Sequence, residues 1–123
     1  MTDNNQKTDR SDRLVVDCVV VDGVRVVTVQ GEIDHDVKDA LGGALMSEEG
    51  AVSPLRVVAD LSGVTFIDSS GINILVAAHR RVRDVQGWLR IAGAREPVMR
   101  VLQIVGLDTV VTCHPTTEQA LNA

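Results

Sequence analysis

The stretch "LRVVADLSGVTFIDSSGINILVAAHRRVRD", residues 55–84, decides the fold class. Residues 55–61 are almost continuously apolar, which is typical of a strand buried on both faces of a parallel sheet. Residues 62–68 interrupt that run with small and polar side chains, and we expect them to form a loop. From Ser70 to Asp84 the apolar side chains recur at the spacing of an amphipathic helix. A buried strand that leads into such a helix is the repeating unit of an α/β protein.

Two valine-rich runs precede this stretch, at residues 14–23 and 24–31. The dipeptide Asp22-Gly23 separates them, and such a pair is a strong signal for a two-residue hairpin turn. After these runs the apolar residues change to helical spacing, and Asp34 is a suitable N-cap for a helix. The N-terminal part therefore predicts an antiparallel hairpin followed by a helix.

The segments after the stretch alternate in the same way. Residues 87–93 and 107–113 are predicted as short strands, and residues 96–106 between them as a helix. Pro97 suits the first turn of that helix. Thr116, followed three residues later by a glutamine, predicts the cap of a last helix. The element order β-β-α-β-α-β-α-β-α predicts a mixed, mainly parallel sheet of about five strands, with an N-terminal hairpin and about four helices.

The composition indicates one small domain. The chain has 123 residues, of which 45% are hydrophobic, so it is long enough to bury a core of its own. It has one Phe, one Trp and a net charge of -5, which argues against binding nucleic acid by stacking or through a basic surface. No apolar run reaches the length of a membrane span, and no signal peptide is recognisable. We therefore expect a disordered polar tail at residues 1–12, a domain at residues 13–123, and a cytoplasmic monomer that binds neither nucleic acid nor membranes.

Cysteine and histidine are too scattered to predict a metal site. Cys18 and Cys113 lie in valine-rich segments without C-x-x-C spacing, and we interpret both as buried, reduced thiols. The three histidines form no ligand pattern. We expect no metal and no cofactor.

The quartet Asp68-Ser69-Ser70-Gly71 stands where the apolar stretch becomes a helix, and it allows several interpretations. Either serine could cap the helix by accepting a free backbone N–H, which stabilises a helix by about 1 kcal/mol. A catalytic serine is disfavoured, because only half of a G-x-S-x-G motif is present. His79 is also a poor base, since it would lie roughly 15 Å away along the same helix. The capping interpretation stays open beside that of a switch.

A phosphorylation switch fits an exposed serine at a helix N-terminus. A phosphate adds about -1.5 to -2 charge, which the positive end of the helix dipole tolerates. A partner that docks on the neutral loop would then be repelled while the domain stays folded. Asp68 itself is a poor phosphate acceptor, because the two lysines of the chain, Lys7 and Lys38, do not follow a later strand as a receiver-type site requires.

Three segments together carry a family resemblance. They are "GEIDHD" at residues 31–36, "VVADLSGVTFIDSSGI" at residues 57–72, and "VMRVLQIVGLDTVVTCHPTTEQAL" at residues 98–121. In this order and spacing, residues 14–122 resemble the STAS domain, and most closely the bacterial anti-anti-sigma factors (anti-sigma factor antagonists). The resemblance implies the α/β STAS fold, in which helices cover one face of the sheet.

The same resemblance implies a function without catalysis. The unphosphorylated protein would bind an anti-sigma factor that is also a serine kinase, and so free a sigma factor for transcription. The kinase, which brings its own ATP and magnesium, would phosphorylate Ser69 and end the complex. A PP2C-type phosphatase would restore the active form. The alternative is a structural or regulatory STAS subunit of a membrane transport system.

The resemblance also implies a docking surface around the acceptor serine. Asp34 of the Gly-Glu-x-Asp segment would contribute to it, as would Asp68, Ser70 and Gly71. Ile72 and Val76 are open to two interpretations, because the chain departs here from a family pattern with a second glycine. They are either peripheral core residues or exposed apolar contacts for the kinase. The expected core stripe of this helix consists of Ile74, Ala78, Val82 and Val85.

Overall fold

The computed structural model describes residues 14–46 and 55–123, so the predicted tail at residues 1–12 lies outside the described residues. Leu14–Val21 (β1) and Val24–Ile33 (β2) form the expected antiparallel hairpin. The turn residues Asp22 and Gly23 have φ angles of 53° and 82°. Positive φ at both central positions is the turn geometry that matches the twist of the two strands. The hairpin prediction is therefore confirmed.

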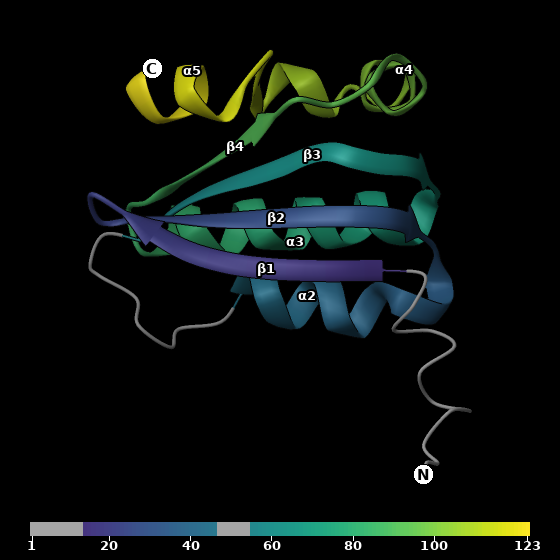
Figure 1. Cartoon of the computed structure of the whole chain (residues 1–123), viewed down its shortest axis with the longest axis horizontal. Coiled ribbons are helices and arrows are strands. Elements are labelled where there is room, and N and C mark those ends of the chain that lie inside the picture. Colours follow the sequence, from purple (N-terminus) through teal and green to yellow (C-terminus); the bar gives the residue numbers. More distant parts are fainter. Residues whose placement is uncertain (1–13, 47–54) are drawn as a thin grey trace, which may run out of the picture.

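The remaining strands extend the hairpin into one sheet (Figure 1). They are Arg56–Ile67 (β3), Trp88–Ala92 (β4) and Thr112–His114 (β5). The five strands lie in the order β1-β2-β3-β4-β5, and β2 to β5 are parallel to one another. Consequently the carboxyl ends of β2, β3 and β4 lie at the same end of the sheet, which is where parallel sheets place their binding sites. The predicted mixed, mainly parallel sheet is confirmed.

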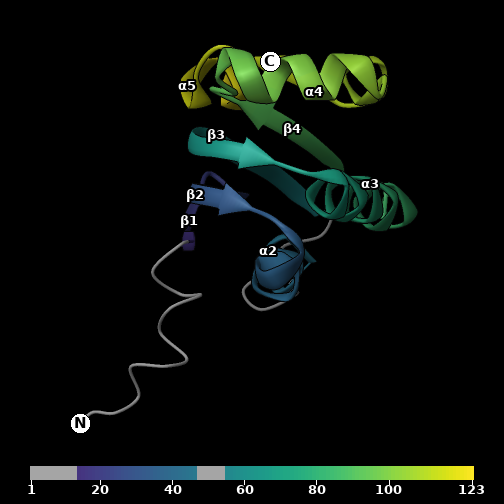
Figure 2. The same ribbon diagram turned by 90° about the vertical axis from the view of Figure 1, so that its right-hand side faces the viewer.

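Helices lie on both faces of this sheet (Figure 2). The elements are His35–Val37 (η1, a 3-10 turn), Lys38–Met46 (α2), Ser69–Asp84 (α3), Glu96–Ile104 (α4), Leu107–Thr109 (η2, a second 3-10 turn) and Thr117–Asn122 (α5). The larger core joins α2, α3 and α4 to one face of the sheet. A smaller core on the other face joins α5 to three strands through Val24, Val26, Val58, Ala92 and Ala120. The placement of α5 differs from the expectation that all helices cover one face.

β3 is longer than predicted, and the loop expected at residues 62–68 is wrong. The strand has 12 residues and runs through the Ser-Gly pair up to Ile67. Its pairing with β2 shifts register between Thr28 and Gln30, so that Gln30 stands opposite Gly63. At this irregularity a Cβ on Gly63 would lie only 2.6 Å from the Gln30 Cγ atom. The small residues thus allow a bulge inside a continuous strand.

The strand predicted at residues 107–113 is shorter than expected. Gly106 ends α4 with a φ angle of 79°, and the next residues form η2 instead of a strand. The backbone N–H groups of Val110 and Val111 both donate to the carbonyl of Leu107, at 3.0 and 2.9 Å. These local bonds compete with the sheet, and only Thr112–His114 pairs with β4.

The two cysteines are less buried than predicted: Cys18 is exposed and Cys113 is half-buried. Burial, with a smaller contribution from Asp108, raises the pKa of the Cys113 thiol. Since the thiolate is the reactive form, we expect iodoacetamide at neutral pH to label Cys18 about tenfold faster than Cys113. Peptide mass spectrometry after timed labelling measures both rates. Equal rates would contradict the assigned burial.

Among the described residues, no helix has the length and the apolar character needed to cross a lipid bilayer.

Candidate functional site

The candidate site lies at the carboxyl ends of β2 and β3, which are joined by backbone hydrogen bonds. Ile33 and Ile67 are paired across the two strands. Asp68, the residue that follows β3, donates its backbone N–H to the Ile33 carbonyl at 3.1 Å. Asp34 follows Ile33 directly, and its carbonyl accepts the first hydrogen bond of η1, from Val37 at 3.2 Å. The loop after β2 and the start of α3 therefore form one surface, as the element order predicts.

Asp68, and neither serine, caps α3. Its backbone is extended, with φ -112° and ψ -171°. Its Oδ1 atom accepts the backbone N–H groups of Ser70 at 2.9 Å and of Gly71 at 3.2 Å. The interpretation that a serine side chain caps the helix is therefore wrong, because the helix begins one residue earlier than expected. Neither serine hydroxyl is therefore needed as the cap of α3.

We expect Asp68→Ala to lower the free energy of unfolding by about 1–2 kcal/mol, because two backbone N–H groups lose their acceptor. Asp68→Asn is the matched control, since its amide oxygen can accept the same bonds, and it should cost less than about 0.5 kcal/mol. Urea denaturation followed by circular dichroism measures both values. Equal losses in the two variants would show that the charge of Asp68, and not its hydrogen bonds, stabilises the helix.

The two serines differ in exposure. Ser69 is the first residue of α3 and is exposed, whereas Ser70 is half-buried. In the described part of the chain, the Ser69 hydroxyl makes no hydrogen bond. The first turn of α3 contains no acidic side chain after the cap. A phosphate on Ser69 would thus stand in solvent at the positive end of a 16-residue helix.

Gly71 allows α3 to pack closely against the ends of β2 and β3. A Cβ atom at this position would lie 2.6 Å from side-chain carbons of both Ile33 and Ile67. Such a distance is below van der Waals contact, so only glycine allows this close packing. Gly71 faces the core, and it shapes the site by setting the position of the helix. Its predicted role in contacting a partner stays a prediction.

The core stripe of α3 is rotated from the expected one. The buried residues are Gly71, Ile72, Leu75, Ala78 and Val82. The side chain of Ile72 is only 8% exposed, so its interpretation as an exposed contact is wrong and it belongs to the core. Val76 is half-buried against that core, and its predicted contact role stays open. Val85, expected in the stripe, is 42% exposed at the end of the helix.

Phe66 is a surface residue that the sequence analysis did not single out. It stands opposite Glu32 near the carboxyl ends of β3 and β2. Phe66 is the only phenylalanine in the chain, and its large apolar side chain is 49% exposed. An exposed aromatic side chain two positions before the cap of α3 is a suitable contact for a protein partner. Its position could have been recognised only with β3 predicted at its full length.

The histidine of α3 is not placed for catalysis. His79 follows Ser69 by about ten positions, roughly 15 Å along the helix. Burial, and secondarily Arg83, lowers its pKa. Among the described residues, no group of three or more His, Cys, Asp or Glu side chains could hold a metal ion. His79 is therefore too far from Ser69 to act as its base.

Residues 15–120 match the model of the STAS domain family. The chain belongs to the STAS domain family. A named relative of this STAS protein is the anti-sigma-F factor antagonist RsfB of Mycobacterium tuberculosis, 32% identical over 111 residues that cover 89% of this chain and 88% of RsfB. The crystal structure of an anti-sigma factor antagonist from Mycobacterium paratuberculosis is 34% identical, with a TM-score of 0.80 over 90% of this chain and 93% of that one. The family resemblance is confirmed.

Two more distant structures share the STAS fold alone. The Bacillus cell fate determinant SpoIIAA in its phosphorylated form is 22% identical, with a TM-score of 0.67 over 88% of this chain and 97% of that one. A sulfate transporter family protein from Wolinella succinogenes is 20% identical, with a TM-score of 0.72 over 85% of this chain and 86% of that one. Likeness at this level of identity does not favour the alternative role in transport.

Proposed function

We propose that this STAS protein is an anti-sigma factor antagonist that is controlled by phosphorylation of Ser69. In its unphosphorylated form it binds an anti-sigma factor that is also a serine kinase, and a sigma factor is released. The relatives with at least 30% identity that carry this name support the proposal. The observation that carries the switch is the exposed Ser69 hydroxyl at the first position of α3.

The docking surface of the proposed complex lies over the joined ends of β2, β3 and α3. Asp34 stands beside the cap of α3, because the backbone bond from Asp68 to Ile33 joins the two segments. The exposed ring of Phe66 and the half-buried Ser70 complete a surface that is small and mixed in polarity. Such a surface gives a partner an apolar anchor surrounded by polar contacts.

Phosphorylation would change this surface without unfolding it. The phosphate adds about -1.5 to -2 charge next to the carboxylate of Asp68, on a surface that already carries Asp34. The N-terminus of α3 stabilises that charge locally. A partner held close to Ser69 meets a desolvated like charge and dissociates. A PP2C-type phosphatase would remove the group, while ATP and magnesium come with the kinase. Action in the cytoplasm as a monomer stays a prediction.

Phosphate mapping tests this proposal. The purified protein is incubated with its anti-sigma factor and ATP, and the modified peptide is sequenced by mass spectrometry. We expect one phosphate on Ser69, none in Ser69→Ala, and normal modification in the matched control Ser70→Ala. Phosphate found on Ser70 or Thr65 would overturn the acceptor assignment. Absence of any complex with an anti-sigma factor would overturn the function itself.

A further inference from the structure

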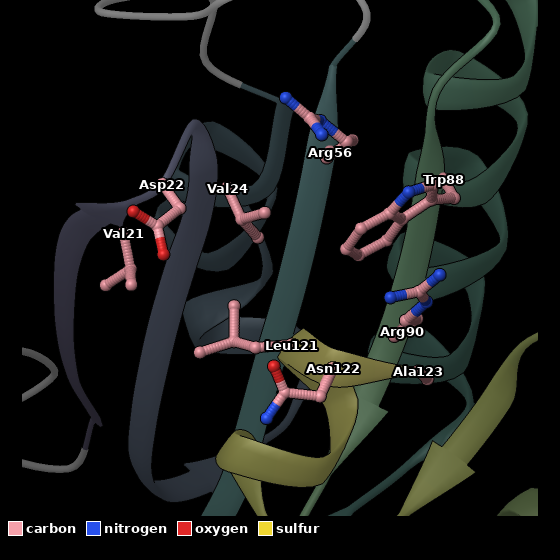
Figure 3. A pocket seen from close by; sticks show the side chains of 9 residues that line it. All are labelled: Val21, Asp22, Val24, Arg56, Trp88, Arg90, Leu121, Asn122 and Ala123. Atoms are coloured by element: carbon pink, nitrogen blue, oxygen red, sulfur yellow. The ribbon is translucent and has the colours of Figure 1, made fainter.

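A pocket of about 310 Å³ lies at the end of the sheet opposite to Ser69. The turn between β1 and β2, the first residues of β3 and β4, and the end of α5 border it (Figure 3). Because β3 has 12 residues, roughly 35 Å separate this pocket from the cap of α3. The lining residues are Val21, Asp22, Val24, Arg56, Trp88, Arg90, Leu121, Asn122 and Ala123.

Arg56 contributes a guanidinium group to the pocket. Its Nε atom is buried and has no hydrogen-bond partner in the described part of the chain. Its Nη2 atom lies over the hairpin turn, where a Cβ on Gly23 would be only 2.9 Å away. Because the Nε atom is enclosed, an oxyanion in the pocket would accept charge-assisted hydrogen bonds from the Nη atoms of Arg56. The Arg56 side chain thus offers charged donors to a ligand in the pocket.

Arg90 is the second cation, and its position is fixed by two contacts. Its Cζ atom lies 3.6 Å from the centroid of the Trp88 ring. Its Nη1 atom donates to the Ala120 carbonyl of α5 at 2.8 Å. Figure 3 shows Arg56 and Arg90 on either side of the Trp88 ring. The ring lies between the two guanidinium groups, so Arg90 adds a second positive charge near Arg56 without being a ligand of the same anionic group.

The other walls of the pocket are apolar or weakly polar. Val24 is buried in the smaller core, and Trp88 and Leu121 pack against that core. Asp22, in the hairpin turn, is the one carboxylate side chain among the lining residues, against two arginines. The side chains therefore favour a negative ligand that also has an apolar part.

We propose that this pocket binds a small organic anion, with its phosphate or carboxylate group on Arg56, in the positive field of Arg90, and its apolar part against Trp88 and Leu121. This proposal does not depend on the proposed function at Ser69, because the two sites share no residue. Either can fail while the other stands.

Trp88 is the only tryptophan of the chain, so its fluorescence reports on the pocket directly. The full chain is titrated with phenyl phosphate, benzoate and inorganic phosphate, each to about 10 mM. We expect a saturable change with at least one organic anion, which should bind about tenfold more tightly than inorganic phosphate because of its apolar part. The tighter of phenyl phosphate and benzoate identifies the anionic group. No saturable change with any probe overturns the proposal.

Three variants assign the binding to this pocket. Arg56→Gln should weaken binding of the better organic anion by about tenfold or more. Asp22→Asn should strengthen it by about threefold, because a repulsive charge is removed while asparagine tolerates the positive φ angle of the turn. Arg100→Gln, on the exposed surface of α4, is the control and should change nothing. Unchanged affinity in Arg56→Gln, with a native circular dichroism spectrum, would overturn the proposal.

Discussion

Ser69→Asp is expected to weaken binding of the anti-sigma factor by about 100-fold, which corresponds to about 2.7 kcal/mol. The new carboxylate stands at an exposed helical position beside the carboxylate of Asp68 and close to Asp34. In the complex all three would be desolvated together, and like charges in an interface cost several kcal/mol. The doubly charged phosphate should weaken binding further, by about 1000-fold. Isothermal titration of the purified partner measures each dissociation constant.

Three controls distinguish the effect of a charge at position 69 from the effect of side-chain size and from that of the protein's net charge. Ser69→Ala and Ser69→Asn should bind within about threefold of the unmodified protein, because neither adds charge to the exposed position. Gln103→Asp adds the same charge on the exposed surface of α4 and should also leave binding unchanged. If Ser69→Asn weakens binding as much as Ser69→Asp, the interface excludes bulk and the electrostatic switch is wrong. The variants at position 69 should retain their stability, since that side chain is exposed.

The fold follows from sequence patterns wherever the period and the turn residues agree. The Asp-Gly turn and the alternation of strands and helices predict the sheet correctly, because few other arrangements bury those apolar runs. The pattern fails at Ser62-Gly63, where two residues that usually mark a loop form a bulge inside β3. It also fails after Gly106, where local hydrogen bonds of η2 replace the expected strand. At Ser62-Gly63 the structure depends on pairing with β2, which is distant in sequence. After Gly106 it depends on backbone hydrogen bonds within the turn itself.

The site was predictable in location but not in detail. Element order alone places Asp34 beside the quartet, since the carboxyl ends of adjacent parallel strands meet. The capping residue is undetermined by sequence, because aspartate and serine are equally good caps and stand next to each other. The sequence leaves Ile72 open between core and surface, and its 8% exposure decides for the core. The observed stripe keeps Ala78 and Val82 but replaces Ile74 and Val85 by Ile72 and Leu75.

Gly71→Ala is expected to lower the free energy of unfolding by about 1–3 kcal/mol, even though alanine is the better helix former. The added methyl group would overlap the side chains of Ile33 and Ile67, at 2.6 Å from each, and these residues are buried at the ends of β2 and β3. Either the isoleucines leave their preferred rotamers or α3 moves away from the sheet. Urea denaturation of the purified variant measures the loss.

Gly43→Ala is the matched control for Gly71→Ala. Gly43 is an exposed residue of α2, and a Cβ atom there meets nothing within 4 Å. The Gly43→Ala substitution should therefore raise the free energy of unfolding by about 0.5–1 kcal/mol through helix propensity alone. The opposite signs of the two changes distinguish crowding from propensity. Because α3 carries Ser69, displacement of the helix in Gly71→Ala should also slow phosphorylation of Ser69, while Gly43→Ala should leave that rate unchanged. A stable Gly71→Ala variant with a normal rate would show that the close contact with Ile33 and Ile67 does not position the acceptor serine.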